Sequence, residues 1–169
     1  MKVLSITTPD IENGIGCRVT IWISGCNRRC PGCHNQRAWD YNLGSNLMSE
    51  KVLSKICECV DHDYIDGITL SGGDPLDQTD DNLRELLEFI KGFKDKFPQK
   101  DIWIYSGGLY EDLINEPLTK DILSECDVLV DGPFVQSMKV IDLPFRGSIN
   151  QRIIDIKQSL VKGTIIVLK

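Results

Sequence analysis

The sequence predicts an α/β fold in which a mostly parallel sheet forms an incomplete β/α barrel. Predicted strands alternate with predicted helices, an order typical of parallel strands joined by crossover helices. A closed barrel of eight such units needs about 250 residues, and this chain has 169. We therefore expect an open barrel of about five or six strands. We expect it to form one domain over residues 1–169.

Runs of β-branched and aromatic residues predict the strands. They occupy residues 19–23, 65–70, 102–105, 127–131 and 165–168. Apolar residues at helical spacing predict the helices. They occupy residues 49–60, 79–97 and 109–125, the last interrupted at Pro117. Residues 151–156 fit a strand or a helix equally well by periodicity.

Two of the predicted helices begin at residues suited to an N-cap. Ser49 precedes the first helix and Thr79 precedes the second, and hydroxyl side chains can accept a hydrogen bond from the first free N–H groups of a helix. The second helix also carries Lys94 in its last turn, where a positive charge suits the helix dipole. Pro98 follows directly and marks its end.

Composition and charge exclude several classes of protein. The net charge is −6, whereas nucleic-acid binding depends on Lys and Arg side chains that neutralise phosphates, so we expect no nucleic-acid partner. No apolar run approaches the roughly 20 residues of a membrane span, and the first residues are too short an apolar run for a signal peptide. We therefore expect a cytoplasmic protein without a membrane partner, in which the seven cysteines are thiols or metal ligands rather than disulfides.

Four unusual segments each follow a predicted strand. They are the cysteine-rich segment 25–35 and the glycine-containing segments 71–75, 106–108 and 132–133. In α/β folds, ligands bind at the carboxyl ends of the parallel strands. We therefore expect these segments to meet at one edge of the sheet and to form the functional site.

The cysteine-rich segment carries the most specific signal. Cys26, Cys30 and Cys33 have the spacing C-x3-C-x2-C, which lets three thiolates reach three corners of one cubane. An electron-transfer cluster normally has four cysteine ligands, and with three, one iron remains open to a small molecule, as in a catalytic metal site. Gly25 and Gly32 allow the backbone to approach the sulfur atoms closely. The spacing therefore predicts a [4Fe-4S] cluster.

A structural zinc site is the alternative that we weighed for the same thiols. Zinc requires a fourth ligand at suitable spacing, but His34 directly adjoins Cys33 and His62 lies in another element. The remaining cysteines do not supply a second group of metal ligands. Residues two apart in a helix point to nearly opposite sides, which separates Cys57 from Cys59. We interpret the remaining cysteines as small apolar residues, namely Cys17, Cys57, Cys59 and Cys126.

The cysteine spacing resembles the signature of the radical S-adenosylmethionine enzymes. Other segments resemble the glycyl-radical activating enzymes, and most of all the branch that activates anaerobic ribonucleotide reductases. The similar segments cover residues 13–18, 25–35, 68–76, 127–134 and 146–152. An activator of another glycyl-radical enzyme, of the pyruvate formate-lyase type, remains an alternative, as does a non-catalytic iron–sulfur or zinc binding module.

The resemblance implies a fold, two cofactors and two partners. The fold is a partial barrel of the radical S-adenosylmethionine type. The cofactors are a [4Fe-4S] cluster and S-adenosylmethionine, whose reductive cleavage gives a 5′-deoxyadenosyl radical that takes a hydrogen atom from a partner's glycine. The partners are the large subunit of an anaerobic ribonucleotide reductase, with its glycine-containing loop, and an external one-electron donor such as a flavodoxin-like protein.

The resemblance also implies roles for particular residues. The cluster ligands, which are also the catalytic residues, are Cys26, Cys30 and Cys33. The residues that contact S-adenosylmethionine are Gly32, Cys33, His34, Gly72, Gly73 and Asp74.

Three arginines stand near these segments without an assigned role. Arg18 is either a surface arginine or a fork for a carboxylate, including an acidic group of a partner. Arg146 and Arg152 flank a polar loop, which the resemblance places near the cofactor or the protein substrate.

Overall fold

A computed structural model describes residues 1–168. Its strands are β1 (Lys2–Asp10), β2 (Arg18–Ile23), β3 (Ser45–Asn46), β4 (Gly67–Gly72), β5 (Asp101–Tyr105), β6 (Val128–Asp131) and β7 (Arg152–Asp155). Its α-helices are α1 (Glu50–Val60), α2 (Asp80–Lys96), α3 (Tyr110–Leu113), α4 (Pro117–Glu125) and α5 (Ile156–Lys162). Two short 3-10 helices, η1 (Gln36–Trp39) and η2 (Gln136–Met138), lie in the connections.

The strands form one seven-stranded sheet in the order β3-β1-β2-β4-β5-β6-β7. Its centre is parallel, because β2 pairs with β4, β4 with β5, and β5 with β6 in the same direction. Antiparallel strands complete both sides, with β1 and β3 beyond β2, and β7 beyond β6. The predicted α/β class with a mostly parallel sheet is confirmed.

Most of the predicted elements are confirmed, and the differences are local. The closing strand predicted at 165–168 is wrong, since only Val167 pairs there, in an isolated bridge to Ile154. The ambiguous segment 151–156 divides into β7 and the first residue of α5. The sheet has more strands than expected because β1 and the two-residue strand β3 extend one side.

The caps of the two main helices follow the predictions in part. At the start of α2, the Thr79 side chain accepts a hydrogen bond from the Asn82 N–H at 3.4 Å, which confirms the predicted N-cap. Ser49 occupies the N-cap position of α1, but its hydroxyl donates to the Asn46 carbonyl at 2.7 Å and caps no N–H group. Within residues 1–168, no helix has both the length and the apolarity that a membrane crossing needs.

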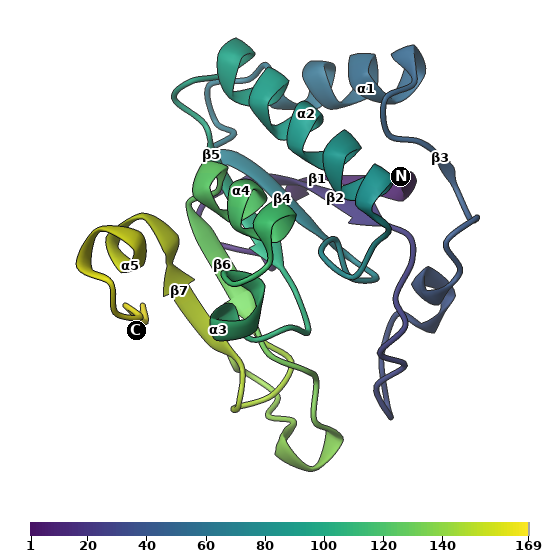
Figure 1. Ribbon diagram of the computed structural model, residues 1–169. Helices are drawn as coiled ribbons and strands as arrows, with labels where there is room; N and C mark the ends of the chain where they lie inside the picture. The colour runs from purple at the N-terminus through teal and green to yellow at the C-terminus, as the bar shows by residue number, and fades with distance from the viewer. Residues whose placement is uncertain (169) are drawn as a thin grey trace.

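The main α-helices cover one face of the central sheet (Figure 1). Alternate side chains of a strand point to opposite faces. On one face Ile68, Leu70 and Ile104 join the main core with the apolar side chains of the helices, such as Leu86 of α2 and Ile122 of α4. Figure 1 shows α1, α2 and α4 gathered along this side.

The other face of the sheet is covered by loops instead of helices. Trp103 and Val130 project there with Ile153 and form a second, smaller core, against which Tyr105 and Phe145 pack. The long connection from β6 to β7 extends beyond the carboxyl ends of the strands, as does the segment after β2 (Figure 1). A cavity lies over this face, at the edge of the sheet where the sequence predicts the site.

Candidate functional site

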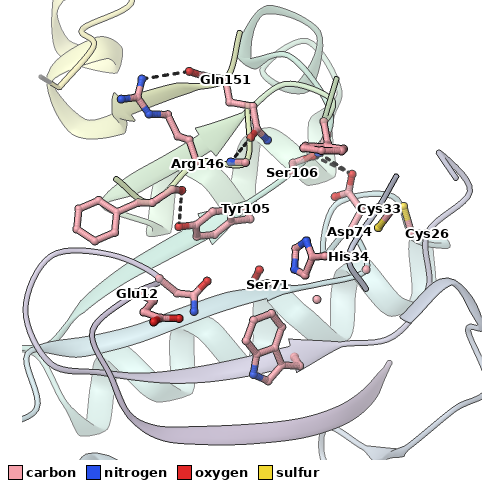
Figure 2. A pocket seen from close by; sticks show the side chains of 18 of the residues that line it. Glu12, Cys26, Cys33, His34, Ser71, Asp74, Tyr105, Ser106, Arg146 and Gln151 are labelled. Atoms are coloured by element: carbon pink, nitrogen blue, oxygen red, sulfur yellow. Dashed lines mark hydrogen bonds between the residues drawn. The ribbon is translucent and has the colours of Figure 1, made fainter. Parts of the chain in front are cut away.

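A cavity of about 680 Å³ lies at the carboxyl ends of the parallel strands. All four predicted segments contribute to its lining, through Cys26, Cys30, Cys33, Ser71, Gly72, Gly73, Asp74, Ser106, Gly107 and Gly132. The prediction that these segments share one edge of the sheet is therefore confirmed. Figure 2 shows Cys26 and Cys33 near Asp74 at one end of this cavity, with Tyr105, Arg146 and Gln151 along another wall.

The three predicted ligands are free thiols on this cavity. Cys26 is buried, whereas Cys30 and Cys33 are partly exposed. Burial raises the pKa of the Cys26 thiol, and hydrogen bonds from the backbone of Arg28 and Arg29 oppose that rise. In this conformation, no group of three His, Cys, Asp or Glu side chains among residues 1–168 is close enough to hold a metal ion, so the thiols share the cavity without converging on one point.

The donor set on the cavity nevertheless suits a cubane cluster with one open iron. Three soft thiols come from a single short loop, and Arg29 within it has a φ of 46°, a left-handed conformation that lets the chain turn tightly between two of the ligands. The other cysteines lie elsewhere. Cys59 and Cys126 belong to the main hydrophobic core and Cys17 packs against it, which confirms that these three act as small apolar residues, and Cys57 is half-buried on α1.

The residues predicted to contact S-adenosylmethionine lie mostly on this cavity. Cys33, His34 and Asp74 line it together with the glycine pair at the end of β4. Gly32 is not part of the lining. It adopts a φ of 74° and lies against the side chain of Gln136 in η2, so the cysteine loop contacts the long β6–β7 connection at this residue.

The glycine pair after β4 is packed against the cysteine loop itself. A Cβ atom at Gly73 would lie 2.3 Å from the carbonyl oxygen of Gly25 and 2.7 Å from that of Ala38. The N–H of Gly73 donates to the Ile23 carbonyl at 2.7 Å, and the N–H of Asp74 donates to the Gly25 carbonyl at 2.9 Å. Only glycine fits at position 73, because the backbone that follows β2 fills the space of a side chain.

Asp74 has a carboxylate that is fully engaged by protein donors. The residue is 1% exposed. Its Oδ2 accepts hydrogen bonds from Arg28 Nε at 2.8 Å, from the Gly107 N–H at 2.9 Å and from Ser106 Oγ at 3.2 Å, and its Oδ1 accepts from the Leu76 N–H at 3.0 Å. These bonds join the cysteine loop to the ends of β4 and β5. The predicted contact between Asp74 and the cofactor stays a prediction.

Two further residues, which sequence reasoning missed, bind the backbone of the cysteine loop from the segment that follows β4. The side-chain amide of Gln78 donates to the carbonyls of Ser24 and Gly25, each at 3.2 Å. A carboxylate oxygen of Asp77 accepts from the Asn27 N–H at 2.7 Å. Both residues stand next to a segment that the sequence already marks, but their contact with the loop depends on the pairing of β2 with β4 and has no local signal.

The opposite wall of the cavity comes from β5 and the β6–β7 connection. Tyr105 donates its hydroxyl hydrogen to the Phe145 carbonyl at 2.8 Å, and burial raises the pKa of that hydroxyl. The Gln151 side chain accepts from the Gly147 N–H at 2.8 Å, and Arg146 donates to the Gln151 carbonyl at 3.4 Å (Figure 2). This wall is therefore held in place by its own hydrogen bonds, and Arg146 lies on the cavity.

Arg18 is neither a surface arginine nor free to bind a partner. Its side chain is completely buried and forms an ion pair with Asp101 at 2.7 Å. Its Nε donates to Thr69 Oγ1 at 2.7 Å, another guanidinium nitrogen donates to the Ile68 carbonyl at 2.6 Å, and the guanidinium lies 5.3 Å from the ring centre of Trp103. Arg18 does pair with a carboxylate, but through one nitrogen only, and the carboxylate is that of Asp101 in this chain.

Arg152 also has an internal role. It donates to the carboxylates of Glu111, at 2.9 and 2.7 Å, and of Asp131, at 2.9 Å and at a second, shorter contact. Hydrogen bonding to Arg152 lowers the pKa of Glu111 to about 2. Asp131 and Arg152 are also register partners in the pairing of β6 with β7. Arg152 therefore stabilises the ends of the two strands between which the β6–β7 connection runs.

Comparison with known proteins points to one family. Residues 12–154 match the family model described as "4Fe-4S single cluster domain". A protein of Pasteurella multocida (strain Pm70) is 39% identical over 153 residues, which cover 89% of this chain and 95% of that protein. Similar proteins of Escherichia coli (strain K12), at 36% identity, and Enterobacteria phage T4, at 35%, cover 84% and 85% of this chain and 90% and 87% of their own lengths. All three are named "Anaerobic ribonucleoside-triphosphate reductase-activating protein".

Proposed function

Because this chain belongs to the family of anaerobic ribonucleoside-triphosphate reductase-activating proteins, we propose that it activates such a reductase by generating a glycyl radical on it. One structural observation supports this proposal in addition to family membership. The three thiols and the glycine pair after β4 face one cavity, as an enzyme needs if it is to hold a cluster and a small cofactor together. The chain is accordingly an enzyme with an iron–sulfur domain.

The proposed ligands of the [4Fe-4S] cluster are Cys26, Cys30 and Cys33, with one iron left open for S-adenosylmethionine. When bound, these two cofactors would supply a reductive cleavage that gives the 5′-deoxyadenosyl radical, which takes a hydrogen atom from the partner's glycine. The side chains of this protein then need to ligate, orient and shield, and none has to act as an acid or a base.

In this proposal the cavity walls orient S-adenosylmethionine. Cys33 and His34 would contact one part of it, and Gly72 and Gly73 would offer backbone carbonyls to its ammonium group. The predicted contact of Gly32, which lies outside the lining of this cavity, stays a prediction. Asp74 would keep this turn in position. The apolar wall that contains Tyr105 and Phe145 would limit the access of water. The fold would then be a partial barrel of the radical S-adenosylmethionine type, whose open side admits a loop of the protein substrate.

The proposed partners are the large subunit of the reductase, through its glycine-containing loop, and an external one-electron donor such as a flavodoxin-like protein. The proposed location is the cytoplasm, where cysteines remain reduced. A partner loop fits this chain better than a small substrate does, because none of its remaining cysteines lies on the cavity as an auxiliary cluster would require.

The first part of the test is cluster content. Anaerobically reconstituted protein should contain about four irons per chain, and Cys26→Ala, Cys30→Ala and Cys33→Ala should each abolish a normal cluster. Cys57→Ala is the matched control, since this thiol lies on α1. Zinc without iron after anaerobic preparation would exclude the proposed chemistry in favour of a zinc-binding module.

The second part is the radical. Reduced protein, S-adenosylmethionine and the reductase are mixed without oxygen, and electron paramagnetic resonance should detect a glycyl radical on the reductase together with ribonucleotide reduction. Cleavage of S-adenosylmethionine without that radical would show that the substrate assignment is wrong. A radical on a pyruvate formate-lyase type of enzyme instead would establish the alternative activator.

A further inference from the structure

Arg28 and Asp74 place one positive and one negative charge beside the predicted cluster ligands. Arg28 stands in the cysteine loop between Cys26 and Cys30, and both charged residues line the cavity. The Arg28 Nε lies 2.8 Å from Asp74 Oδ2. Its aliphatic stem packs on Gly107, where a Cβ atom would come within 2.3 Å of the Arg28 Cδ. The guanidinium is therefore held between the cysteine loop and the end of β5.

The two charges differ in their exposure to solvent. The Arg28 side chain is 35% exposed and the Asp74 side chain is 1% exposed. The guanidinium carries a full positive charge, because an arginine side chain does not lose its proton in proteins. Water and salt screen an exposed charge more than a buried one, which leaves Asp74 as the less screened of the two.

We propose that Arg28 and Asp74 form a positioning pair that fixes the cysteine loop and sets the reduction potential of the cluster held by its thiols. This inference rests on the proposed function, because it requires a cluster at Cys26, Cys30 and Cys33. Reduction adds one negative charge to the cluster. The Arg28 charge stabilises the reduced form, the Asp74 charge destabilises it, and the local charge is one of the factors that set the potential of an iron–sulfur centre.

The positioning role follows from the hydrogen bonds of the carboxylate. Asp74 binds Arg28 of the cysteine loop, and it also binds Ser106 and Gly107 at the end of β5. Loss of the carboxylate breaks the bonds to all three groups and to the Leu76 N–H, whereas loss of the guanidinium breaks only the bond between Arg28 and Asp74. Substitutions of Arg28 and of Asp74 can therefore distinguish the effect of the charges on the potential from the effect of the loop's position.

The test is a redox titration of the anaerobically reconstituted protein, with the reduced cluster followed by electron paramagnetic resonance. Asp74→Asn should raise the reduction potential and Arg28→Gln should lower it. The double variant should lie between the wild type and Asp74→Asn, because the less screened Asp74 charge has the larger effect on the potential. Arg28→Lys retains the charge and should stay closer to wild type than Arg28→Gln. Arg37→Gln is the matched control, since Arg37 is an exposed arginine of η1 and its removal should leave the potential unchanged.

The outcomes separate this inference from the proposed function. A complete cluster with the same potential in all variants, or with shifts of the same sign for Asp74→Asn and Arg28→Gln, would overturn the inference and leave the proposed function intact. Absence of a cluster from the wild-type protein would instead refute the proposed function. If Asp74→Asn does not fold, the comparison of Arg28→Gln with Arg28→Lys decides, because equal potentials in these two variants would contradict a role for the charge.

Discussion

Replacing Gly73 with alanine tests how closely the turn after β4 lies against the cysteine loop. The new methyl group would stand 2.3 Å from the Gly25 carbonyl oxygen and 2.7 Å from the Ala38 carbonyl oxygen. Ordinary contacts of carbon atoms lie near 3.5 Å, so one segment must move by roughly 1 Å. Gly73 does not have a left-handed φ, and the effect of the substitution is therefore steric.

The size of the effect follows from what this movement disrupts. The Gly25 carbonyl accepts hydrogen bonds from the Asp74 N–H and from Gln78, and each such bond contributes about 0.5–1.5 kcal/mol. Overpacking of a tight site costs about 1–3 kcal/mol, so we expect Gly73→Ala to lower the free energy of unfolding by that amount. For a chain of 169 residues, each kcal/mol lowers the melting temperature by roughly 2–4 °C.

Thermal unfolding of the anaerobically reconstituted protein measures this loss, and iron content and cleavage of S-adenosylmethionine report on the site. A displacement of about 1 Å can reduce turnover by about 100-fold. The control is Gly92→Ala on the exposed side of α2, where a Cβ atom meets nothing within 4 Å, and where alanine should stabilise the helix by about 0.5–1 kcal/mol. Wild-type stability and turnover in Gly73→Ala would refute the close approach.

Three further substitutions test other parts of the structure. Cys57→Ala should keep wild-type iron content and cofactor cleavage, and loss of the cluster in a folded variant would contradict the placement of that thiol on α1. Arg18→Met should destabilise the fold by about 3 kcal/mol in denaturant unfolding, because it breaks a buried network of hydrogen bonds, and a neutral result would show that this network is dispensable. The Arg152–Glu111 pair should stabilise the fold above the unfolded-state pKa of about 4.5 and lose this effect as the pH falls towards the folded-state pKa of about 2. The stability difference between wild type and Glu111→Gln should therefore shrink with falling pH, and it will be small because the Glu111 side chain is 52% exposed.

The parallel centre of the sheet and the main helices were predictable because their signals are local. The apolar runs of β2, β4, β5 and β6 and the capped, periodic sequence of α2 each identify one element without reference to the rest of the chain. The segment 165–168 has the same β-branched composition as a strand, yet a strand also needs a neighbour along its length. Only Val167 finds one, at Ile154, and that requirement cannot be read from composition.

The site was predictable to the extent that its chemistry is concentrated in one segment. The spacing of Cys26, Cys30 and Cys33 is a local signal, and the glycine pair is recognisable by its position after a strand. The burial of Arg18 was not predictable, because it depends on Asp101 and Trp103, which reach it only through the order of the strands. The same reason hides the contacts of Gln78 and the wall formed around Tyr105.

The three proposed cluster ligands and the residues that hold their loop in place lie far apart in the chain, which has a consequence for the assembly of the protein. All three thiols are synthesised within the first 33 residues, but the supports of the cysteine loop, from Asp74 to Gly107, come much later in the chain. A nascent chain that ends before residue 74 already exposes three cysteines, but it lacks the Asp74 carboxylate that binds Arg28 in the cysteine loop. Such a chain would offer its thiols to any available metal or oxidant, so delivery of iron and sulfide is expected to be productive only after β5 has joined the sheet.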